Sequence, residues 1–334
     1  MTAEINKFLK ISGLIALPYA VLIILYFILD PFLVLRDYRN YYAQKSPLRN
    51  IDYVSTEMYA MNHAKEKYDS FIFGSSKSQA FKAVEWKKYL NNAKTFHFSA
   101  NAESVFGIYG KVKFIHSMHD TIRNALLVID HETFELTGND KGVLFIKHPL
   151  ISNESRFNFH AEFIKAWFQN LFFFKYIYFL ITGANLPFIS HVLDLRPVIY
   201  NPETNDLYYK HYDDAIASDS GKYYSHPVFR NRIRKSVFSK ETITVNGMAE
   251  LEFIAGIFKR DHTNYKIVIS PSFDQELFNR TDLKKLQLIF KEENIYDFSG
   301  VNDLTIFAYN YYEEEHYRPF VANRILKKVY TSQP

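Results

Sequence analysis

The stretch FIFGSSKSQAF, residues 71–81, is the first place in the chain where the residue types could do chemistry. An apolar run ends at Gly74, serines follow at positions 75, 76 and 78, and apolar side chains then return at helical spacing. A turn between a strand and a helix can hold a nucleophilic serine, or it can bind an anion at the free N–H groups of the helix. An ordinary turn is the third interpretation.

A serine hydroxyl is a weak nucleophile unless a histidine takes its proton, and an acid usually orients that histidine. Near the other end, in NYYEEEHYRPFVANRIL (310–326), Glu313 precedes His316 by three positions. A carboxylate at this spacing can accept a hydrogen bond from the imidazole Nδ1 and leave Nε2 for a serine proton. The two segments therefore indicate a Ser-His-Glu triad, although Glu-x-x-His is also a spacing of metal ligands.

Binding of phosphate by a known loop motif is disfavoured. Gly74 is followed neither by the second glycine and lysine of a P-loop nor by the G-x-G-x-x-G pattern of dinucleotide sites. No second cluster of histidine and carboxylate compares with Glu313 and His316, which disfavours a metal site. We therefore expect no cofactor and no metal.

Composition narrows the class of protein further. The 334 residues suit one large domain or one domain with an insertion. The net charge of +4 is mild and no long Lys/Arg block is present, so we do not expect nucleic-acid binding. The absence of cysteine excludes disulfides, thiolate metal sites and a cysteine nucleophile. The 17% aromatic content is compatible with contact to a membrane or a sugar surface, and equally with a biased composition.

The N-terminal segment predicts a membrane anchor. Residues 11–29 carry no charge, and a run of about 20 apolar residues spans a bilayer core. No small-x-small cleavage site follows, so we expect a retained anchor (1–35) with a kink at Pro18, followed by a tether (36–66). Lysines before the span and arginines after it leave the orientation open. We expect a single-pass protein of a bacterial plasma or inner membrane, with its large domain periplasmic or extracellular.

The rest of the chain predicts an α/β fold. Short apolar runs, rich in β-branched and aromatic residues, alternate with segments of helical period; they are residues 70–73, 95–98, 125–130, 266–270 and 295–298. This alternation favours a mainly parallel sheet covered on both faces, with its site at the carboxyl ends of the strands. We expect the α/β domain in residues 67–134 and 251–334, with an insertion or cap in 135–250. Within that interval, the aromatic segment 163–181 reads as a buried helix or as a helix lying on a membrane, with burial favoured.

Together the two ends of the chain resemble the SGNH/GDSL hydrolase family. In that family a Gly-Asp-Ser block carries the nucleophile and a C-terminal Asp-x-x-His block supplies acid and base. Carried over by position, the resemblance implies Ser76 as nucleophile, His316 as base and Glu313 as the acid that orients it. It also implies a three-layer α/β/α, flavodoxin-like domain. The Gly-Ser-Ser variant and the anchor are similar to the membrane-anchored branch that includes teichoic-acid D-alanyl-transfer proteins and alginate O-acetyltransferases.

The two middle blocks of the family pattern match this sequence less closely. Ala102 stands where the family has a glycine whose N–H holds the oxyanion, and the third block reads Asp130-His131-Glu132-Thr133 in place of Gly-x-Asn-Asp. The resemblance therefore implies oxyanion donors at the N–H groups of Ser76 and Ala102, with Asn101 as a substitute for the missing asparagine. Loss of one such donor can cost about two to three orders of magnitude in rate.

These observations lead to one main hypothesis and one alternative. The first is a membrane-anchored acyl esterase or O-acyltransferase that acts on a cell-envelope glycan or a lipid-linked acyl ester, with a multipass membrane acyltransferase as the partner implied by the resemblance. The alternative is a catalytically inactive SGNH-like scaffold or glycan-binding protein. Of the neighbouring residues, we expect Lys77 to be solvated, and we expect His97 and His131 to be structural.

Overall fold

The computed structural model describes residues 2–44, 46, 49–183 and 198–331. The chain forms two compact units. The first, here called the N-terminal unit, comprises Met1–Arg49, Lys141–Leu144 and Glu154–Leu195. The second, here called the sheet unit, comprises Asn50–Asp140, Phe145–Asn153 and Arg196–Pro334.

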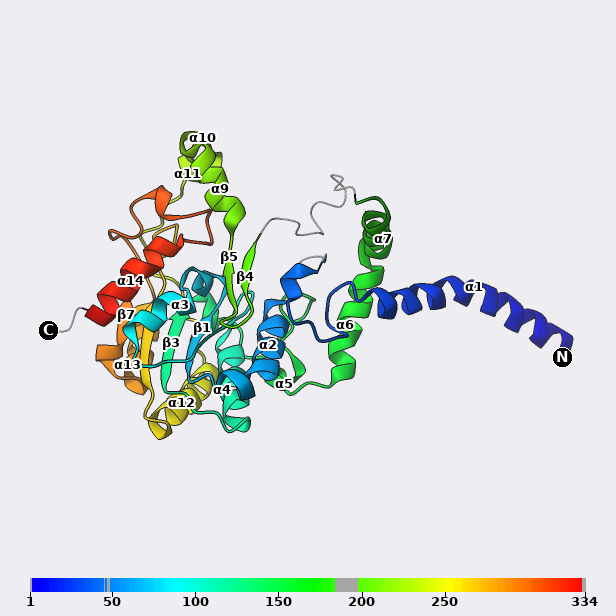
Figure 1. The fold of residues 1–334 in the computed structure, drawn as a ribbon, viewed down its shortest axis with the longest axis horizontal. Coiled ribbons are helices and arrows are strands. Elements are labelled where there is room, and N and C mark those ends of the chain that lie inside the picture. Colours follow the sequence, from blue (N-terminus) through cyan, green and yellow to red (C-terminus); the bar gives the residue numbers. More distant parts are fainter. Residues whose placement is uncertain (1, 45, 47–48, 184–197, 332–334) are drawn as a thin grey trace. The chain divides into compact units, whose positions relative to one another are not determined.

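The sheet unit is built on a five-stranded parallel sheet of order β2-β1-β3-β6-β7, of which β1, β3 and β7 are labelled in Figure 1. Its strands are β1 (Ser70–Gly74), β2 (Thr95–Ser99), β3 (Asn124–Ile129), β6 (Asn264–Ile269) and β7 (Ile295–Asp297). Every residue of β1, β2 and β3 is buried, which is why these strands read as continuous apolar runs. All five predicted strands form, and the prediction of an α/β fold with a parallel sheet is confirmed.

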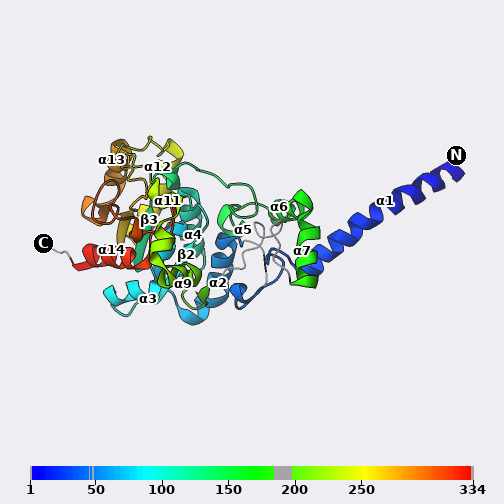
Figure 2. The ribbon, with the colours of Figure 1, turned by 90° about the horizontal axis from the view of Figure 1, so that it is seen from above.

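Helices cover both faces of the sheet because side chains alternate along each strand. Ile72, Leu126 and Val268 belong to one core cluster with the buried side chains of α14 (Pro319–Thr331). On the opposite face, Phe71 packs against Tyr59 of α2 (Ile51–Glu66). Seen from above, α14 and α12 (Val245–Arg260) lie on opposite sides of β3 (Figure 2).

Shorter elements complete the sheet unit. The helices are α3 (Ala83–Trp86), α4 (Val105–Ser117), α5 (Pro149–Ser152), α9 (Lys210–Ser218), α10 (Ser220–Tyr224), α11 (Pro227–Arg230) and α13 (Arg280–Ile289). A separate hairpin of β4 (Ile199–Asn201) and β5 (Asp206–Tyr208) is joined to β2, where the N–H of His97 donates to the carbonyl of Thr204 at 2.8 Å. This hairpin comes from the interval 135–250 that we predicted as an insertion or cap.

Part of the predicted tether belongs to the sheet unit. Asn50 begins α2, and its side chain accepts a hydrogen bond from the N–H of Tyr53 at 2.9 Å. The helix ends at Lys67, whose left-handed backbone (φ 56°) closes the last turn. Residues 51–66 therefore form a helix that packs against the sheet.

The N-terminal unit contains α1 (Thr2–Leu29), α6 (Arg156–Phe168) and α7 (Phe172–Thr182). Residues Ala3–Leu29 of α1 are long and apolar enough to cross a membrane, with Pro18 inside the helix. Its last carbonyls are satisfied, because the Arg36 guanidinium donates to Phe27 O (2.9 Å) and Ile28 O (2.7 Å). The predicted aromatic segment 163–181 forms two helices rather than one, separated by a turn at Asn170 and Leu171.

Four charged side chains are buried together in the sheet unit. Lys111 of α4 lies 2.9 Å from Asp52 of α2 and also contacts Glu103, and Lys147 lies 2.8 Å from the second oxygen of Glu103. Although burial opposes ionisation of Asp52, the charge of Lys111 lowers the pKa of this carboxyl. Two cations balance two anions, which is the condition under which buried charges are tolerated.

Removal of one cation should destabilise the sheet unit. Lys111→Met leaves Asp52 and Glu103 without their shared partner, so we expect a loss of about 3 to 5 kcal/mol in the free energy of unfolding. Denaturant titration measures it. The control is Lys88→Met, because Lys88 is exposed in its pair with Glu85 and should change stability by less than about 1 kcal/mol. Equal stability of the two variants would contradict this account.

Candidate functional site

The site begins where β1 ends. A Cβ atom on Gly74 would lie 2.5 Å from the carbonyl oxygen of Val128 in β3 and 2.8 Å from Ser78 Cβ. No side chain fits there, so glycine is required at this position by close approach of the backbones. Immediately after it, Ser75 begins a short 3-10 helix (Ser76–Ala80), and its Oγ accepts from the N–H of Lys77 at 3.3 Å.

The three serines of this turn have different surroundings. Ser78 is buried; its hydroxyl donates to Ser75 O (2.7 Å) and lies 2.9 Å from His97 Nε2. Ser75 caps the 3-10 helix. Ser76, the predicted nucleophile, is half-buried and lines a pocket together with His316. Of the three serines, Ser76 is the one that lines this pocket.

His97 belongs to a structural hydrogen-bond network. Its Nδ1 lies 3.5 Å from Asp206 Oδ1, and Asp206 also accepts from the N–H of Ala83 (2.9 Å) and the hydroxyl of Thr204 (3.0 Å). Burial lowers the pKa of His97, so the ring is neutral at physiological pH. Ser78, His97 and Asp206 thus repeat the residue types of a triad, but they are closed to solvent and connect β2 to the hairpin.

Glu313 and His316 are held together by a tight loop. Tyr311 and Tyr317 pair across it in an antiparallel bridge, and the N–H of Tyr312 donates to His316 O at 2.8 Å. Inside the loop, the Glu313 carboxylate accepts a hydrogen bond from His316 Nδ1. Burial acts to raise the pKa of Glu313, but the hydrogen bond and charge of His316 outweigh it and lower this pKa. The predicted pairing of acid and histidine is therefore present in the structure.

This pairing determines which nitrogen of His316 can act as a base. With Nδ1–H donated to Glu313, the neutral ring carries its lone pair on Nε2. Nε2 is buried and has no hydrogen-bond partner in the described part of the chain. Ser76 and His316 line one pocket, but Ser76 Oγ and His316 Nε2 make no hydrogen bond with each other in these described residues.

The shared pocket is small, and four tyrosines contribute to its wall. It encloses ≈ 20 Å³, which is room for about one water molecule. It is lined by Ser76, Gln79, Ala80, Lys82, Tyr208, Tyr209, Asp213, Tyr312, His316, Tyr317 and Pro319. Tyr312 donates to Asp213 at 2.7 Å, so α9 of the predicted cap contributes to the wall.

Two of the predicted oxyanion residues lie just after the neighbouring strand. Asn101 and Ala102 follow β2, which is paired with β1 up to Gly74 and Ser99. Ala102 has φ 41°, a left-handed conformation that glycine adopts without strain. Neither Asn101 nor Ala102 is among the residues that line the pocket of Ser76 and His316.

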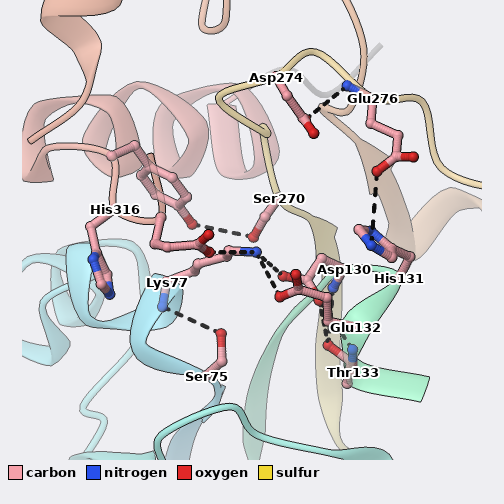
Figure 3. A network of polar contacts seen from close by, with 12 residues as sticks. Ser75, Lys77, Asp130, His131, Glu132, Thr133, Ser270, Asp274, Glu276 and His316 are labelled. Carbon is pink, nitrogen blue, oxygen red and sulfur yellow. Dashed lines mark hydrogen bonds and ion pairs between the residues drawn. The ribbon is translucent and has the colours of Figure 1, made fainter. Parts of the chain in front are cut away.

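The third block carries an ion-pair network in place of an asparagine donor. Figure 3 shows Lys77 extending toward Asp130 and Glu132, at 2.7 and 3.2 Å. The same ammonium lies 3.7 Å from Glu315, the residue before His316. The second oxygen of Asp130 accepts from the N–H and hydroxyl of Thr133, both at 3.1 Å. Both oxygens of Asp130 therefore accept hydrogen bonds within this network.

Our expectation that Lys77 is solvated was wrong. Burial acts to lower its pKa, but the charges of Asp130 and Glu132 outweigh it and raise this pKa, so Lys77 is charged. In turn, although burial opposes ionisation of Asp130, the charge of Lys77 lowers the pKa of that carboxyl. The partners are 53 or more positions away in sequence, which is why no local pattern indicates the network.

Lys82 is a second functional candidate that the sequence did not single out. It lines the pocket, is buried, and its ammonium donates to the carbonyls of Gln79 and Leu207. Burial lowers the pKa of Lys82 to about 8, against the opposing charges of Asp206 and Asp213. Lys82 joins the serine turn to β5. It is the one lysine among the described residues that line the pocket, and its pKa of about 8 lies close to neutral pH.

His131 lies at the edge of this region, with Nε2 3.8 Å from Glu276 (Figure 3). No group of three or more His, Cys, Asp or Glu with the geometry of a metal site occurs in the described residues. Comparison of the chain with protein-family models and with curated proteins finds no match.

Replacement of Lys77 should destabilise the protein in a pH-dependent way. Lys77→Met leaves Asp130 without its cation, and we expect a loss of about 3 kcal/mol in unfolding free energy at pH 7. The contribution of Asp130 is present above its unfolded-state pKa and is lost as pH falls through its lowered folded-state pKa. The difference from wild type, measured by denaturant unfolding, should therefore shrink below about pH 4. Lys77→Arg is the control that retains the charge, and a difference independent of pH would contradict the ion-pair account.

Lys82 should give a second pH dependence, in the alkaline range. Its folded-state pKa of about 8 lies below the ordinary 10.5, so the unfolded chain binds more protons between these values. Stability of wild type relative to Lys82→Met should rise across that window by about 3 kcal/mol, since one pKa unit corresponds to about 1.4 kcal/mol. Unfolding titrations of both proteins from pH 7 to 10 measure this difference. A flat difference would show that Lys82 titrates normally.

Proposed function

We propose that this protein is a membrane-anchored, SGNH-like acyl esterase or O-acyltransferase. The observation that carries the proposal is the imidazole of His316, which is oriented by Glu313, has a buried and unpartnered Nε2, and lines the same pocket as Ser76. The pocket follows the carboxyl end of β1 in a parallel sheet of flavodoxin-like order, the usual place for a site in such sheets.

In the proposed mechanism, Ser76 Oγ attacks the carbonyl carbon of an acyl ester. The bond from Oγ to carbon forms while His316 Nε2 takes the serine proton, and the carbonyl oxygen becomes an oxyanion. Collapse of this intermediate breaks the bond to the leaving alcohol, which takes the proton from Nε2. Water or a second hydroxyl then receives the acyl group from Ser76, again with His316 as the base.

The remaining residues of the site would stabilise the oxyanion, position the serine turn and stabilise the imidazolium. Backbone N–H groups of Ser76 and Ala102, with Asn101 nearby, are the proposed oxyanion donors. Lys77 is a positioning residue, because its ammonium connects the serine turn to Asp130 and to Glu315 beside His316. The charge of Glu313 stabilises the imidazolium that forms when Nε2 is protonated.

We further propose that α1 is a retained membrane span and that the sheet unit lies in the periplasm or outside a bacterial cell. The Arg36 side chain caps the C-terminal end of helix α1, and no small-x-small cleavage site follows this helix in the sequence. With an envelope location, the substrate class is a glycan or a lipid-linked acyl ester, and a multipass membrane acyltransferase is the partner that the family resemblance implies.

A non-catalytic scaffold or glycan-binding protein is the second candidate. Two observations favour it: Ser76 and His316 make no hydrogen bond with each other in the described residues, and Glu132, a carboxylate with no N–H to donate, stands at the asparagine position of the third block. Because catalytic hydrogen bonds are often long before substrate binds, the first observation weighs less than the second.

A fluorophosphonate probe separates the two candidates. We expect the wild-type protein to be labelled and Ser76→Ala to remain unlabelled, because the probe reacts with an activated serine. His316→Ala should slow labelling by about 10² to 10⁴, the range of a lost general base. Labelling is read from gel fluorescence and from the mass of the modified peptide.

Ser75→Ala is the matched control, since it removes a hydroxyl from the same turn and should retain labelling. If folded wild-type protein is not labelled, the catalytic proposal fails and the binding role is favoured. Labelling of Ser76→Ala at the same rate would assign the nucleophile to another residue.

A further inference from the structure

In the N-terminal unit, a contact between α1 and α6 fixes the position of α6 along the axis of α1. The indole N–H of Trp167 donates to Leu22 O at 3.0 Å, and Trp167 itself is fully buried. Its ring lies 6.1 Å from the ring of Tyr26, and Phe168 lies 6.3 Å from Tyr19. The end of α6 is thus fixed against the C-terminal third of α1.

This contact places α6 and α7 beside the last turns of the apolar helix. Leu22 precedes the end of α1 at Leu29 by seven residues, which is about 10 Å at 1.5 Å per residue. Figure 1 shows α6 and α7 running across this end of α1 rather than along it. If α1 crosses a bilayer, α7 lies at the level where the apolar core meets the headgroups, and roughly in the membrane plane.

The exposed side chains of α7 are suited to the boundary between the apolar core and the headgroups. Phe172, Tyr176 and Phe179 are buried within the unit at helical spacing. A second stripe is exposed and apolar: Phe174 is 57% and Ile181 79% exposed. In water, an exposed stripe of this kind is costly, whereas an interfacial helix buries its apolar face about 5–10 Å into the boundary of the acyl chains.

The composition beside the contact agrees with the same level. Tyr19 lies there and is 60% exposed, and Tyr is one of the residues enriched where membrane meets water. The exposed apolar surface of α1, on which Leu14 is 78% exposed, belongs to the same unit as the exposed stripe of α7. One lipid surface can cover both.

We propose that α7 is an interfacial membrane helix, whose exposed stripe of Phe174 and Ile181 is immersed in the bilayer beside α1. The chain would then be held to the membrane by two elements, and the second would restrict rotation of the unit about α1. This inference rests on the proposal that α1 is a retained membrane span. It does not depend on the proposed chemistry at Ser76.

Site-directed spin labelling tests it on the full chain, because the protein has no cysteine to remove. Phe174→Cys and Ile181→Cys are labelled with a nitroxide in nanodiscs of phosphatidylethanolamine and phosphatidylglycerol. Collision with oxygen, which partitions into lipid, is compared with collision with a polar nickel chelate. We expect oxygen to dominate at both positions, with nickel accessibility reduced about tenfold relative to a water-exposed site, as for a side chain below the headgroups.

Two controls keep the outcomes separate. Leu288→Cys replaces an equally exposed apolar residue in α13 of the sheet unit (82% exposed) and should give the nickel-accessible pattern of water. Leu14→Cys reports on α1. If the label at Leu14→Cys is accessible to nickel, the proposal that α1 spans the membrane fails.

If Leu14 shows lipid contact while Phe174 and Ile181 are nickel-accessible, α7 lies in water and the inference is overturned. Low accessibility to both reagents at the α7 positions would also overturn it, since that pattern means coverage by protein. Near-UV circular dichroism confirms that each variant is folded before labelling.

Discussion

The candidate site depends on the close approach of β1 and β3 at Gly74. A side chain there would collide with the Val128 carbonyl, so the chain can leave the sheet only through a glycine. The turn that follows sends three neighbouring residues in different directions: Ser76 to the pocket, Lys77 to Asp130, and Ser78 to His97. One steric constraint in the centre of a parallel sheet therefore positions the proposed nucleophile together with the groups that hold its turn in place.

Charge then connects this turn to segments far away in the chain. Lys77 contacts Asp130 after β3 and Glu315 before His316, while Lys82 donates to the carbonyl of Leu207 in β5. Burying such groups costs free energy, and the cost is acceptable because each has a charged or carbonyl partner. The result is a site whose parts come from four segments of the chain. For acyl transfer, its aromatic wall must also open, since the cavity holds about one water molecule.

Much of the fold could be predicted because its signals are local. Five apolar runs became five parallel strands, and burial along the whole of β1, β2 and β3 favours the apolar side chains that made these strands predictable. The pairing of Glu313 with His316 was also predictable, because three residues of separation in one loop bring the two side chains together. The aromatic segment 163–181 was not: its composition suits one helix, and the break at Asn170 and Leu171 depends on how the halves pack against α1.

By itself, the sequence determined the class of fold, an apolar N-terminal helix, and the two segments that supply Ser76, Glu313 and His316. Only the tertiary structure decided that Lys77 is paired rather than solvated, that Ser78 is closed to solvent while Ser76 lines a pocket, and that the hairpin and α9 contribute to its wall. The physical reason is distance along the chain. Hydrophobic period and turn chemistry act between near neighbours, whereas the pairing of Lys77 with Asp130 and of His97 with Asp206 requires that the sheet is already formed.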